Sequence, residues 1–252
     1  MATAAERSQS FGAIAEDYDR FRPGPPDEAV DWLLPAGCQV AVDVGAGTGL
    51  LTRVLERKVP RVVAVEPDDR MRAVLSARSP GTEALDGRGE AIPLPEASAD
   101  GVFVSSAWHW MEPEPAVAEV TRVLRDGGRF GLIWTRRDSE TGWLHEISLR
   151  ERAGRARTGR GHRPRSVALP AGAQLTNITT RSFSFMLTTT VDTLVAMLGT
   201  YSGVITATPA EQAAGLDRAR AALDALFPGA REIDVPMQAG CWRADRVPRT
   251  GA

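Results

Sequence analysis

The sequence has few cysteines, few tyrosines and almost no lysine, and these shortages exclude several kinds of protein. Two of its 252 residues are cysteines, Cys38 and Cys241, which are too few for a disulfide framework and too far apart for a CxxC motif. Lys58 is the only lysine. Neither Tyr18 nor Tyr201 is followed by lysine four residues later, so the Tyr-x-x-x-Lys pair of short-chain oxidoreductases is absent. The low cysteine content favours a reducing compartment.

Long apolar runs and a large excess of charge are also missing. No run of eighteen apolar residues occurs, and the first ten residues lack the basic and apolar regions of a signal peptide. The formal net charge of -2 gives no basic field that would recruit nucleic acid or a membrane surface. We therefore expect a cytoplasmic globular protein, a monomer or homodimer, with neither nucleic acid nor membrane as a partner.

The first half of the chain has the pattern of an α/β protein. Between residues 39 and 134, short apolar runs alternate with segments of helical periodicity, which predicts βαβ units and a parallel sheet. We expect a left-handed glycine cap at "RDGG" to end the last of these helices. The predicted strands cover 39–44, 61–66, 82–85, 101–106 and 129–134, and the predicted helices cover 50–58, 69–79 and 114–125.

The sequence pattern in the second half of the chain predicts fewer structural features. A capping box of Thr208 and Glu211, with Pro209 in the first turn, predicts where one helix begins. The arginine-rich segment 155–172 is read as a mobile solvated loop, although it could bind an anionic substrate or RNA. Helices are further predicted at 138–154, 190–202 and 208–227, and strands at 178–187 and 231–244.

A glycine-rich turn in "VAVDVGAGTGLLTRVL" is the most informative local feature. Gly45, Gly47 and Gly49 lie between a predicted strand and a predicted helix, where glycine lets a ligand approach the backbone and the helix start offers free N–H groups. The dinucleotide fingerprint GxGxxG requires glycine where Leu50 stands. Glu66 ends the next strand, where an acidic side chain can bind both hydroxyls of a ribose. The turn therefore predicts a nucleoside ligand.

These segments resemble the motifs of the class I S-adenosylmethionine-dependent methyltransferases. The resemblance is to the small-molecule branch, methyltransferase type 11, which includes trans-aconitate and ubiquinone/menaquinone-pathway methyltransferases. "VDVGAGTG" resembles the first motif of the family, "VVAVEPDDRM" the second, "GEAIPLPEASADGVFVSSAWHW" the third and fourth, and "VLRDGGRFGLIW" the fifth. The resemblance covers residues 11–134, with a looser similarity in the C-terminal strand.

The resemblance implies a fold and a division of the chain. The fold would be α/β and Rossmann-like, with a seven-stranded sheet of order 3-2-1-4-5-7-6, strand 7 antiparallel and helices on both faces. We expect one methyltransferase domain over residues 1–252. Within it, 1–35 would form N-terminal lid helices, 37–135 the cofactor-binding core, 136–230 a substrate-side insert with helices, and 231–243 the closing strand.

The resemblance also implies which residues bind S-adenosyl-L-methionine, with S-adenosyl-L-homocysteine as the product. Asp43 and the adjacent backbone would hold the amino-acid end, and Glu66 the ribose. Pro67 or Met71 would lie against the adenine. Glu90 and Ala91 would contact the edge of the adenine, and Arg88, two residues earlier, stands where many relatives carry Asp or Thr. The cofactor-binding residues by this resemblance are Tyr18, Arg22, Asp43, Gly45, Ala46, Gly47, Glu66, Pro67, Met71, Glu90, Ala91 and Ser105.

Fewer residues are candidates for binding the acceptor or for catalysis. Trp108, His109 and Trp110 would line the acceptor pocket, and no metal site is expected. His109 could act as a general base for an alcohol or phenol, but a packed histidine between two tryptophans is the commoner arrangement. The expected reaction is O-, carboxyl- or C-methylation of a small molecule by in-line displacement. The alternatives are a non-catalytic nucleoside-binding protein and, less favoured, a nicotinamide-dependent oxidoreductase.

Overall fold

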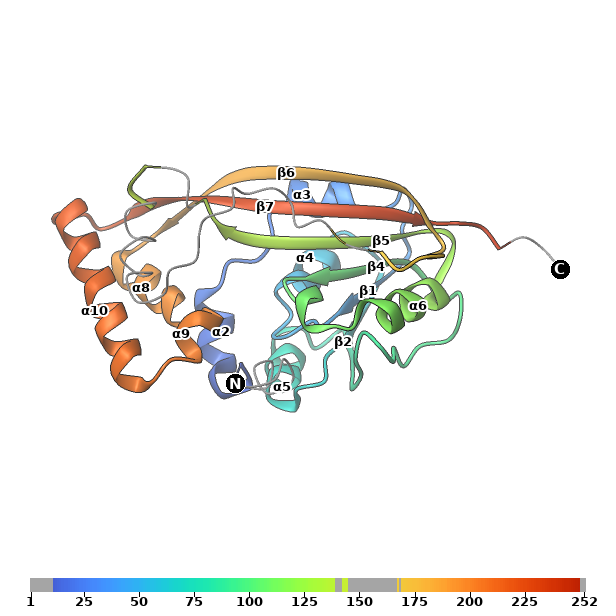
Figure 1. Ribbon diagram of the computed structural model, residues 1–252, viewed down its shortest axis with the longest axis horizontal. Helices are drawn as coiled ribbons and strands as arrows, with labels where there is room; N and C mark the ends of the chain where they lie inside the picture. Colours follow the sequence, from blue (N-terminus) through green and yellow to red (C-terminus); the bar gives the residue numbers. More distant parts are fainter. Residues whose placement is uncertain (1–10, 139–141, 145–166, 168, 250–252) are drawn as a thin grey trace. The chain divides into compact units, whose positions relative to one another are not determined.

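The computed structural model describes residues 11–138, 142–144, 167 and 169–249 (Figure 1). By internal contacts the chain divides into two compact units. Unit 1 comprises residues 1–23, 136–163 and 184–238, and unit 2 comprises 24–135, 164–183 and 239–252. The strands β5, β6 and β7 contribute residues to both units.

The sheet has seven strands in the order β3-β2-β1-β4-β5-β7-β6, which confirms the predicted topology. Strands β1, β2, β3, β4 and β5 pair in parallel, whereas the arrow of β7 in Figure 1 runs opposite to that of β5. All seven predicted strands are present. They are β1 (Val40–Val44), β2 (Arg61–Val65), β3 (Glu83–Leu85), β4 (Ala99–Ser105), β5 (Leu124–Arg137), β6 (Leu175–Thr189) and β7 (Ile233–Arg246).

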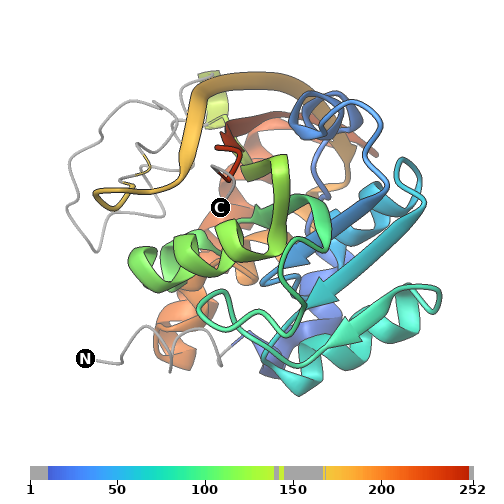
Figure 2. The same cartoon turned by 90° about the vertical axis from the view of Figure 1, so that its right-hand side faces the viewer.

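The parallel strands of unit 2 are buried on both faces. Residues 41–44 of β1, 62–65 of β2 and 101–104 of β4 are buried, as their continuous apolar sequences predict for a covered parallel sheet. Figure 2 shows β1, β2 and β3, in blue to turquoise, next to one another. Since these strands are parallel, their carboxyl ends reach the same edge of the sheet, and the glycine turn and Glu66 follow there.

Helix α5 of unit 2 begins where a side chain satisfies its first N–H groups. The predicted start at Asp69 is confirmed, and the carboxylate of Asp68 caps this helix by accepting hydrogen bonds from the N–H groups of Arg70 and Met71. The elements are α3 (Asp27–Leu33), α4 (Leu50–Glu56), α5 (Asp69–Arg78), the 3-10 turn η2 (Trp108–Trp110) and α6 (Pro113–Val123).

The predicted glycine cap at "RDGG" is wrong. Helix α6 ends at Val123, and Leu124 is already extended, with φ of -65° and ψ of 139°. Leu124 is fully buried and pairs with Ala99 of β4, so the chain enters β5 at once. Gly127 has the left-handed φ of 72° but lies inside β5. The carbonyls of the last helical turn instead accept hydrogen bonds from the loop that precedes β4.

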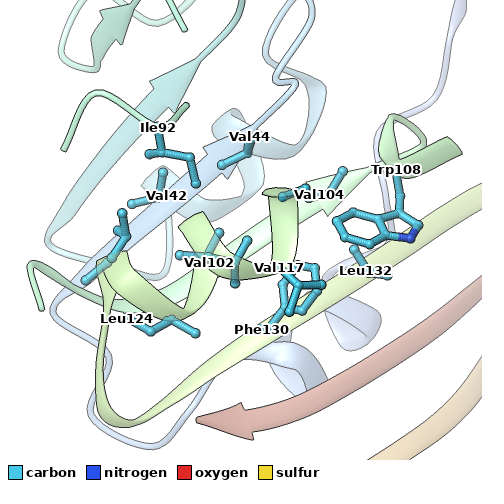
Figure 3. Packing of buried hydrophobic residues seen from close by; sticks show 14 of the residues in the cluster. Val42, Val44, Ile92, Val102, Val104, Trp108, Val117, Leu124, Phe130 and Leu132 are labelled. Atoms are coloured by element: carbon cyan, nitrogen blue, oxygen red, sulfur yellow. The ribbon is translucent and has the colours of Figure 1, made fainter. Parts of the chain in front are cut away.

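An aromatic column of Trp108, Phe130 and Trp242 lies in the core of unit 2, and Figure 3 labels the first two of these residues. Phe130 of β5 has no exposed surface, and its ring lies 5.3 Å from that of Trp108 and 5.5 Å from that of Trp242, both in edge-on geometry. Such aromatic pairs add about 0.5 to 1.5 kcal/mol beyond the area that they bury. The column therefore ties the turn after β4 to β5 and β7.

Unit 1 contains a 3-10 turn and the helices α2, α8, α9 and α10, which Figure 1 draws in blue and orange. Its core is apolar and includes Leu194, Val195 and Leu223, and α8 packs against both α2 and α10. The predicted capping box of Thr208 and Glu211 is confirmed. The elements are η1 (Gly12–Ile14), α2 (Ala15–Phe21), α8 (Val191–Gly199), α9 (Ser202–Ile205) and α10 (Pro209–Leu226).

Two of the sequence predictions fall largely outside the described residues. Of the helix predicted at 138–154, residues 142–144 are described and are helical. Most of the arginine-rich segment 155–172 is not described. Within the described ranges, no helix combines the length and apolar character needed to span a membrane.

The aromatic column generates a stability prediction. Phe130→Ala should lower the free energy of unfolding by about 3 to 5 kcal/mol, because it leaves a cavity between two tryptophan rings. Urea unfolding followed by tryptophan fluorescence measures the change. Phe183→Ala is the control, because Phe183 is only partly buried, 6.2 Å from the ring of Trp32. Equal losses in the two variants would contradict a central role for the column.

Candidate functional site

The glycine turn after β1 is held against the end of β2. The N–H groups of Gly45 and Ala46 donate to the carbonyl of Val65 over 2.8 and 3.2 Å. Gly45, Gly47 and Gly49 all have left-handed φ angles, of 66°, 58° and 87°. Three such residues in five positions explain the glycine spacing, because other residues rarely adopt this conformation.

The three glycines have different surroundings. A Cβ on Gly45 would lie 2.7 Å from the Cβ of Ala107, and one on Gly49 would lie 3.0 Å from Cγ of Leu75. A Cβ on Gly47 would meet no described atom within 4 Å. Close packing therefore accounts for the first and third glycines, whereas the second faces open space.

Glu66 is a buried carboxylate beside that space. Its side-chain oxygens accept hydrogen bonds from the N–H of Gly47 over 2.8 Å and from the N–H of Asp68 over 2.9 Å. Glu66 is 8% exposed, and burial raises its pKa, although these two N–H groups act in the opposite direction. Each carboxylate oxygen can accept a second hydrogen bond. Glu66 thus joins the turn to the start of α5, and each of its oxygens has an acceptor position that no described residue occupies.

Asp43 is the second buried carboxylate of this region. It is fully buried, its Oδ2 accepts from the hydroxyl of Thr52 over 2.7 Å, and its Oδ1 has no hydrogen-bond partner among the described residues. Burial raises the pKa of Asp43 to about 7, with a further contribution from the Glu66 carboxylate and an opposing one from Thr52. The buried hydroxyl of Thr48 likewise has no partner in the described part of the chain. Asp43 anchors α4, and its proposed contact with the amino-acid end stays a prediction.

The residues predicted for the adenine lie around a tight turn before β4. Arg88 and Ala91 form a bridge, and the carboxylate of Glu90 at the corner accepts a hydrogen bond from the N–H of Glu112 over 2.7 Å. Glu112 is the N-cap of α6, so Glu90 stabilises the positive end of that helix. Its role in binding adenine stays a prediction.

Pro67 and Met71 lie on either side of the start of α5. Pro67 is exposed, whereas Met71 is 5% exposed and belongs to the core. Of the two, Pro67 has the surface that a ligand could contact.

Met111 is a residue that the sequence analysis did not select. A Cβ on Gly89 would lie 2.5 Å from its Sδ, and a Cβ on Gly45 would lie 3.1 Å from its Cε. Met111 therefore fills the space left by two glycines and joins the glycine turn to the turn that contains Glu90. Its position directly after a conspicuous "WHW" was the only signal in the sequence.

The segment after β4 places its residues in different environments. Ser105 ends the strand and is half-buried, and Ser106 has a left-handed φ of 56°. Trp108 is 8% exposed and belongs to the core. His109 is exposed, with its ring 4.4 Å from that of Trp110. The role of Ser105 toward the cofactor and the roles of the two tryptophans and His109 toward an acceptor stay predictions.

The remaining predicted cofactor residues, Tyr18 and Arg22, belong to unit 1. The guanidinium of Arg22 lies 5.2 Å from the ring centre of Tyr18. The fold thus brings these two residues together as a pair. Their role over the cofactor stays a prediction.

The buried carboxyl of Asp43 generates a prediction about pH. A folded-state pKa raised from 3.8 to about 7 means that the folded protein holds this proton more tightly than the unfolded chain. The stabilisation of the folded state by this bound proton is complete below about pH 4 and is lost as the pH rises to about 7. The side chain of the Asp43→Asn variant cannot titrate. Its free energy of unfolding should therefore rise relative to that of the wild type as the pH increases from about 4 to about 7. Parallel curves in urea unfolding at several pH values would contradict the shift.

Comparison with known proteins identifies relatives of this chain. Residues 42–132 match the family model Methyltransf_11, described as a methyltransferase domain. An uncharacterized methyltransferase of Mycobacterium tuberculosis is 51% identical over 143 residues, which cover 56% of this chain and 58% of the relative. A malonyl-(acyl-carrier protein) O-methyltransferase of Methylococcus capsulatus is 35% identical over 136 residues, 49% of each protein. The chain thus spans about half the length of these relatives.

A solved structure supports the fold over most of the chain. The structure of a candidate type II methyltransferase from Anaeromyxobacter dehalogenans has a TM-score of 0.69, with 24% identity, and covers 91% of this chain and 100% of that one. The strand order, the glycine turn and the family match over residues 42–132 agree with one another. Residues 42–132 are therefore similar to a methyltransferase domain, and the chain has the fold of a solved methyltransferase structure.

Proposed function

We propose that this protein transfers a methyl group from S-adenosyl-L-methionine to a small-molecule acceptor by in-line displacement. The observation that carries the proposal is the Glu66 carboxylate, which keeps free acceptor positions beside the open side of Gly47. The site lies at the carboxyl edge of the parallel strands, where ligands of open α/β sheets bind.

The residues present fit a nucleoside with a ribose diol. Glu66 and Asp43 are both buried, and both have raised pKa values because burial disfavours their charges. Each Glu66 oxygen accepts one N–H bond from the described residues, so a pair of ligand hydroxyls would supply the further donors that this carboxylate can accept. The absent side chain of Gly47 leaves room for the sugar at the same place.

The chemistry requires little from the protein beyond alignment. S-adenosyl-L-methionine supplies a methyl group on a positively charged sulfur, and the leaving group is neutral. The chain has to orient the acceptor atom and exclude water. His109 is exposed and could take a proton from an alcohol or phenol acceptor, whereas a carboxylate acceptor needs no base.

The acceptor class is the least specified part of the proposal. The name of the Methylococcus relative states O-methylation of a malonyl group, which supports a carboxyl oxygen as the accepting atom here. C-methylation and methylation of other oxygens remain within the proposal. Transfer of labelled methyl from S-adenosyl-L-methionine to a panel of carboxylic acids, phenols and alcohols tests it.

Two other readings predict different outcomes of the same experiments. A non-catalytic binding protein would bind S-adenosyl-L-methionine in isothermal titration but label no member of the panel. An oxidoreductase would bind NAD in preference to S-adenosyl-L-methionine. Leu50, the first residue of α4, stands where the dinucleotide fingerprint GxGxxG has its third glycine. This makes the oxidoreductase the weaker of the two alternatives.

Removing the charge of Glu66 should weaken cofactor binding. Glu66→Gln keeps the size of the side chain but loses a charge-assisted acceptor, which costs about 1.5 to 3 kcal/mol, or about tenfold to a hundredfold in Kd. Isothermal titration with S-adenosyl-L-homocysteine measures the loss. Glu83→Gln is the matched control, because Glu83 is an exposed carboxylate on the neighbouring strand β3, paired with Arg61. Unchanged affinity in Glu66→Gln would show that the ribose site is misplaced.

Filling the space at Gly47 should abolish binding. Gly47→Val places branched atoms in the open region and also strains a residue with φ of 58°. Gly127→Val separates the two effects, because Gly127 has φ of 72° and equally open surroundings but lies in β5. We expect both variants to lose similar stability and only Gly47→Val to lose S-adenosyl-L-homocysteine binding. Normal affinity in a folded Gly47→Val protein would rule out the proposed site.

A further inference from the structure

A second charged group lies within unit 2, on three strands that are neighbours in the sheet. The strands follow one another in the order β5-β7-β6 (Figure 1), and they contribute Arg129, Arg243 and Arg181. Nε of Arg243 donates to the hydroxyl oxygen of Thr179 over 3.2 Å, so this arginine reaches from β7 to β6. Thr179 and Arg181 lie on the same face of β6, because side chains alternate along a strand. The three arginines form one group, the arginine cluster, and all of them belong to unit 2.

Asp245 of β7 is the carboxylate that contacts the arginine cluster. Its Oδ1 accepts from Nε of Arg129 over 2.8 Å, and its Oδ2 accepts from the side-chain amide of Asn177 over 3.2 Å. Neither Arg181 nor Arg243 forms an ion pair with any residue that the structure describes. Asp245 thus offsets one positive charge of the cluster, and the other two have no paired carboxylate.

Trp32 of α3 fixes the position of Arg243. Cζ of the arginine lies 4.1 Å from the ring centre of the indole, and its Nη1 donates to the backbone carbonyl of Trp32. Together with the bond to Thr179, this contact uses two of the five N–H donors of the guanidinium. Both donors on Nη2 and the second donor on Nη1 have no partner within the described ranges. Arg243 is therefore held in one orientation with three unused donors.

Phe183 supports Arg181 in a similar way. Cζ of Arg181 lies 4.8 Å from the ring centre of Phe183, and this ring lies edge-on to that of Trp32 at 6.2 Å. Stacking occupies one face of a guanidinium and leaves its N–H donors, which point outward in its plane, available to a ligand. Arg181 is exposed, so a ligand can reach these donors from solvent. Two neighbouring aromatic rings thus support two guanidiniums.

The positive charges of the arginine cluster oppose one another. Burial lowers the pKa of Arg243 from its usual value. The charge of Arg129 lowers this pKa further and that of Arg181 adds to the effect, whereas Asp245 opposes it. An anion bound at the cluster would offset the repulsion and accept charge-assisted hydrogen bonds from the unused donors. A phosphate group fits, because it carries about two negative charges near neutral pH and its oxygens match the donor fork of arginine.

The arginine cluster is separate from the proposed cofactor site of unit 2. Arg129 pairs with Gly101 near the start of β4, whereas Ser105 at the carboxyl end of β4 pairs with Ile133. Four residues separate these two positions, which is about 13 Å along the strand. The glycine turn and Glu66 follow the carboxyl ends of β1 and β2, which run parallel to β4. A ligand at the cluster would therefore bind at a different place from the cofactor.

We propose that Arg181 and Arg243 form a second ligand site, which binds the phosphate group of a small anion. The group is either inorganic phosphate or the end of a small phosphate monoester. Trp32 and Phe183 are positioning residues that hold the two guanidiniums, and Thr179 fixes the edge of one of them. The site does not depend on the proposed function, because none of these residues belongs to the proposed cofactor site.

Isothermal titration with inorganic phosphate tests the site, with sodium chloride at the same ionic strength as the blank. Arg181→Gln removes one of the two charges and should weaken phosphate binding about tenfold. Arg243→Lys keeps the charge but loses the flat donor fork, so it should weaken binding about fivefold or more. Arg61→Gln is the matched control, because Arg61 is an exposed arginine of β2 that pairs with Glu83. Its affinity for phosphate should stay within about twofold of that of the wild type.

A second titration distinguishes the two sources of the phosphate group. Methyl phosphate should bind within about threefold of inorganic phosphate if the site takes the end of a monoester, and at least about tenfold more weakly if it takes the free ion. Arg181→Gln should weaken whichever probe binds. Because Arg181 is exposed, this variant provides the test even if Arg243→Lys fails to fold.

Two results would overturn the inference. One is a wild type that binds neither inorganic phosphate nor methyl phosphate above the chloride blank. The other is phosphate binding that Arg181→Gln weakens no more than Arg61→Gln does, which would place the phosphate elsewhere or reflect net charge alone. These titrations use no nucleoside, so a failure of S-adenosyl-L-methionine to bind would contradict the proposed function and leave this test intact.

Discussion

The hydrogen bonds of the Glu66 carboxylate are the constraint on which the proposed site depends. They join the N–H of Gly47, after β1, to the N–H of Asp68, before α5, so one side chain fixes two connections of the parallel sheet. Glu66 is therefore a buried carboxylate with a raised pKa, and it lies close to a second buried carboxylate, that of Asp43. Such an arrangement is costly without donors and becomes favourable when a ligand brings hydroxyl groups.

Unit 2 contains two regions of different charge. The glycine turn and the acidic residues at the carboxyl edge of the parallel strands are suited to a neutral or positively charged ligand with hydroxyl donors. The arginine cluster, which lies near the start of β4, is suited to a negative group. The parallel strands thus separate a region rich in hydrogen-bond acceptors from one rich in donors.

The sequence could predict those features that depend on local chemistry. The strand order came from the motif resemblance, and the capping box at Thr208 and the start of α5 came from patterns a few residues long. The end of α6 was mispredicted because pairing of Leu124 with a distant strand overrides the glycine signal. The packing of Met111 against two glycines and the contact of Arg243 with Trp32 are long-range, and no local pattern encodes them.

The most direct test of the account is a crystal structure of the protein with S-adenosyl-L-homocysteine bound. We predict that both ribose hydroxyls donate to the Glu66 carboxylate, within about 2.5 to 3.0 Å, and that the sugar occupies the open side of Gly47. The N–H groups of Gly47 and Asp68 should keep their bonds to the same carboxylate. A nucleoside bound elsewhere, with Glu66 contacting only those two N–H groups, would contradict the account.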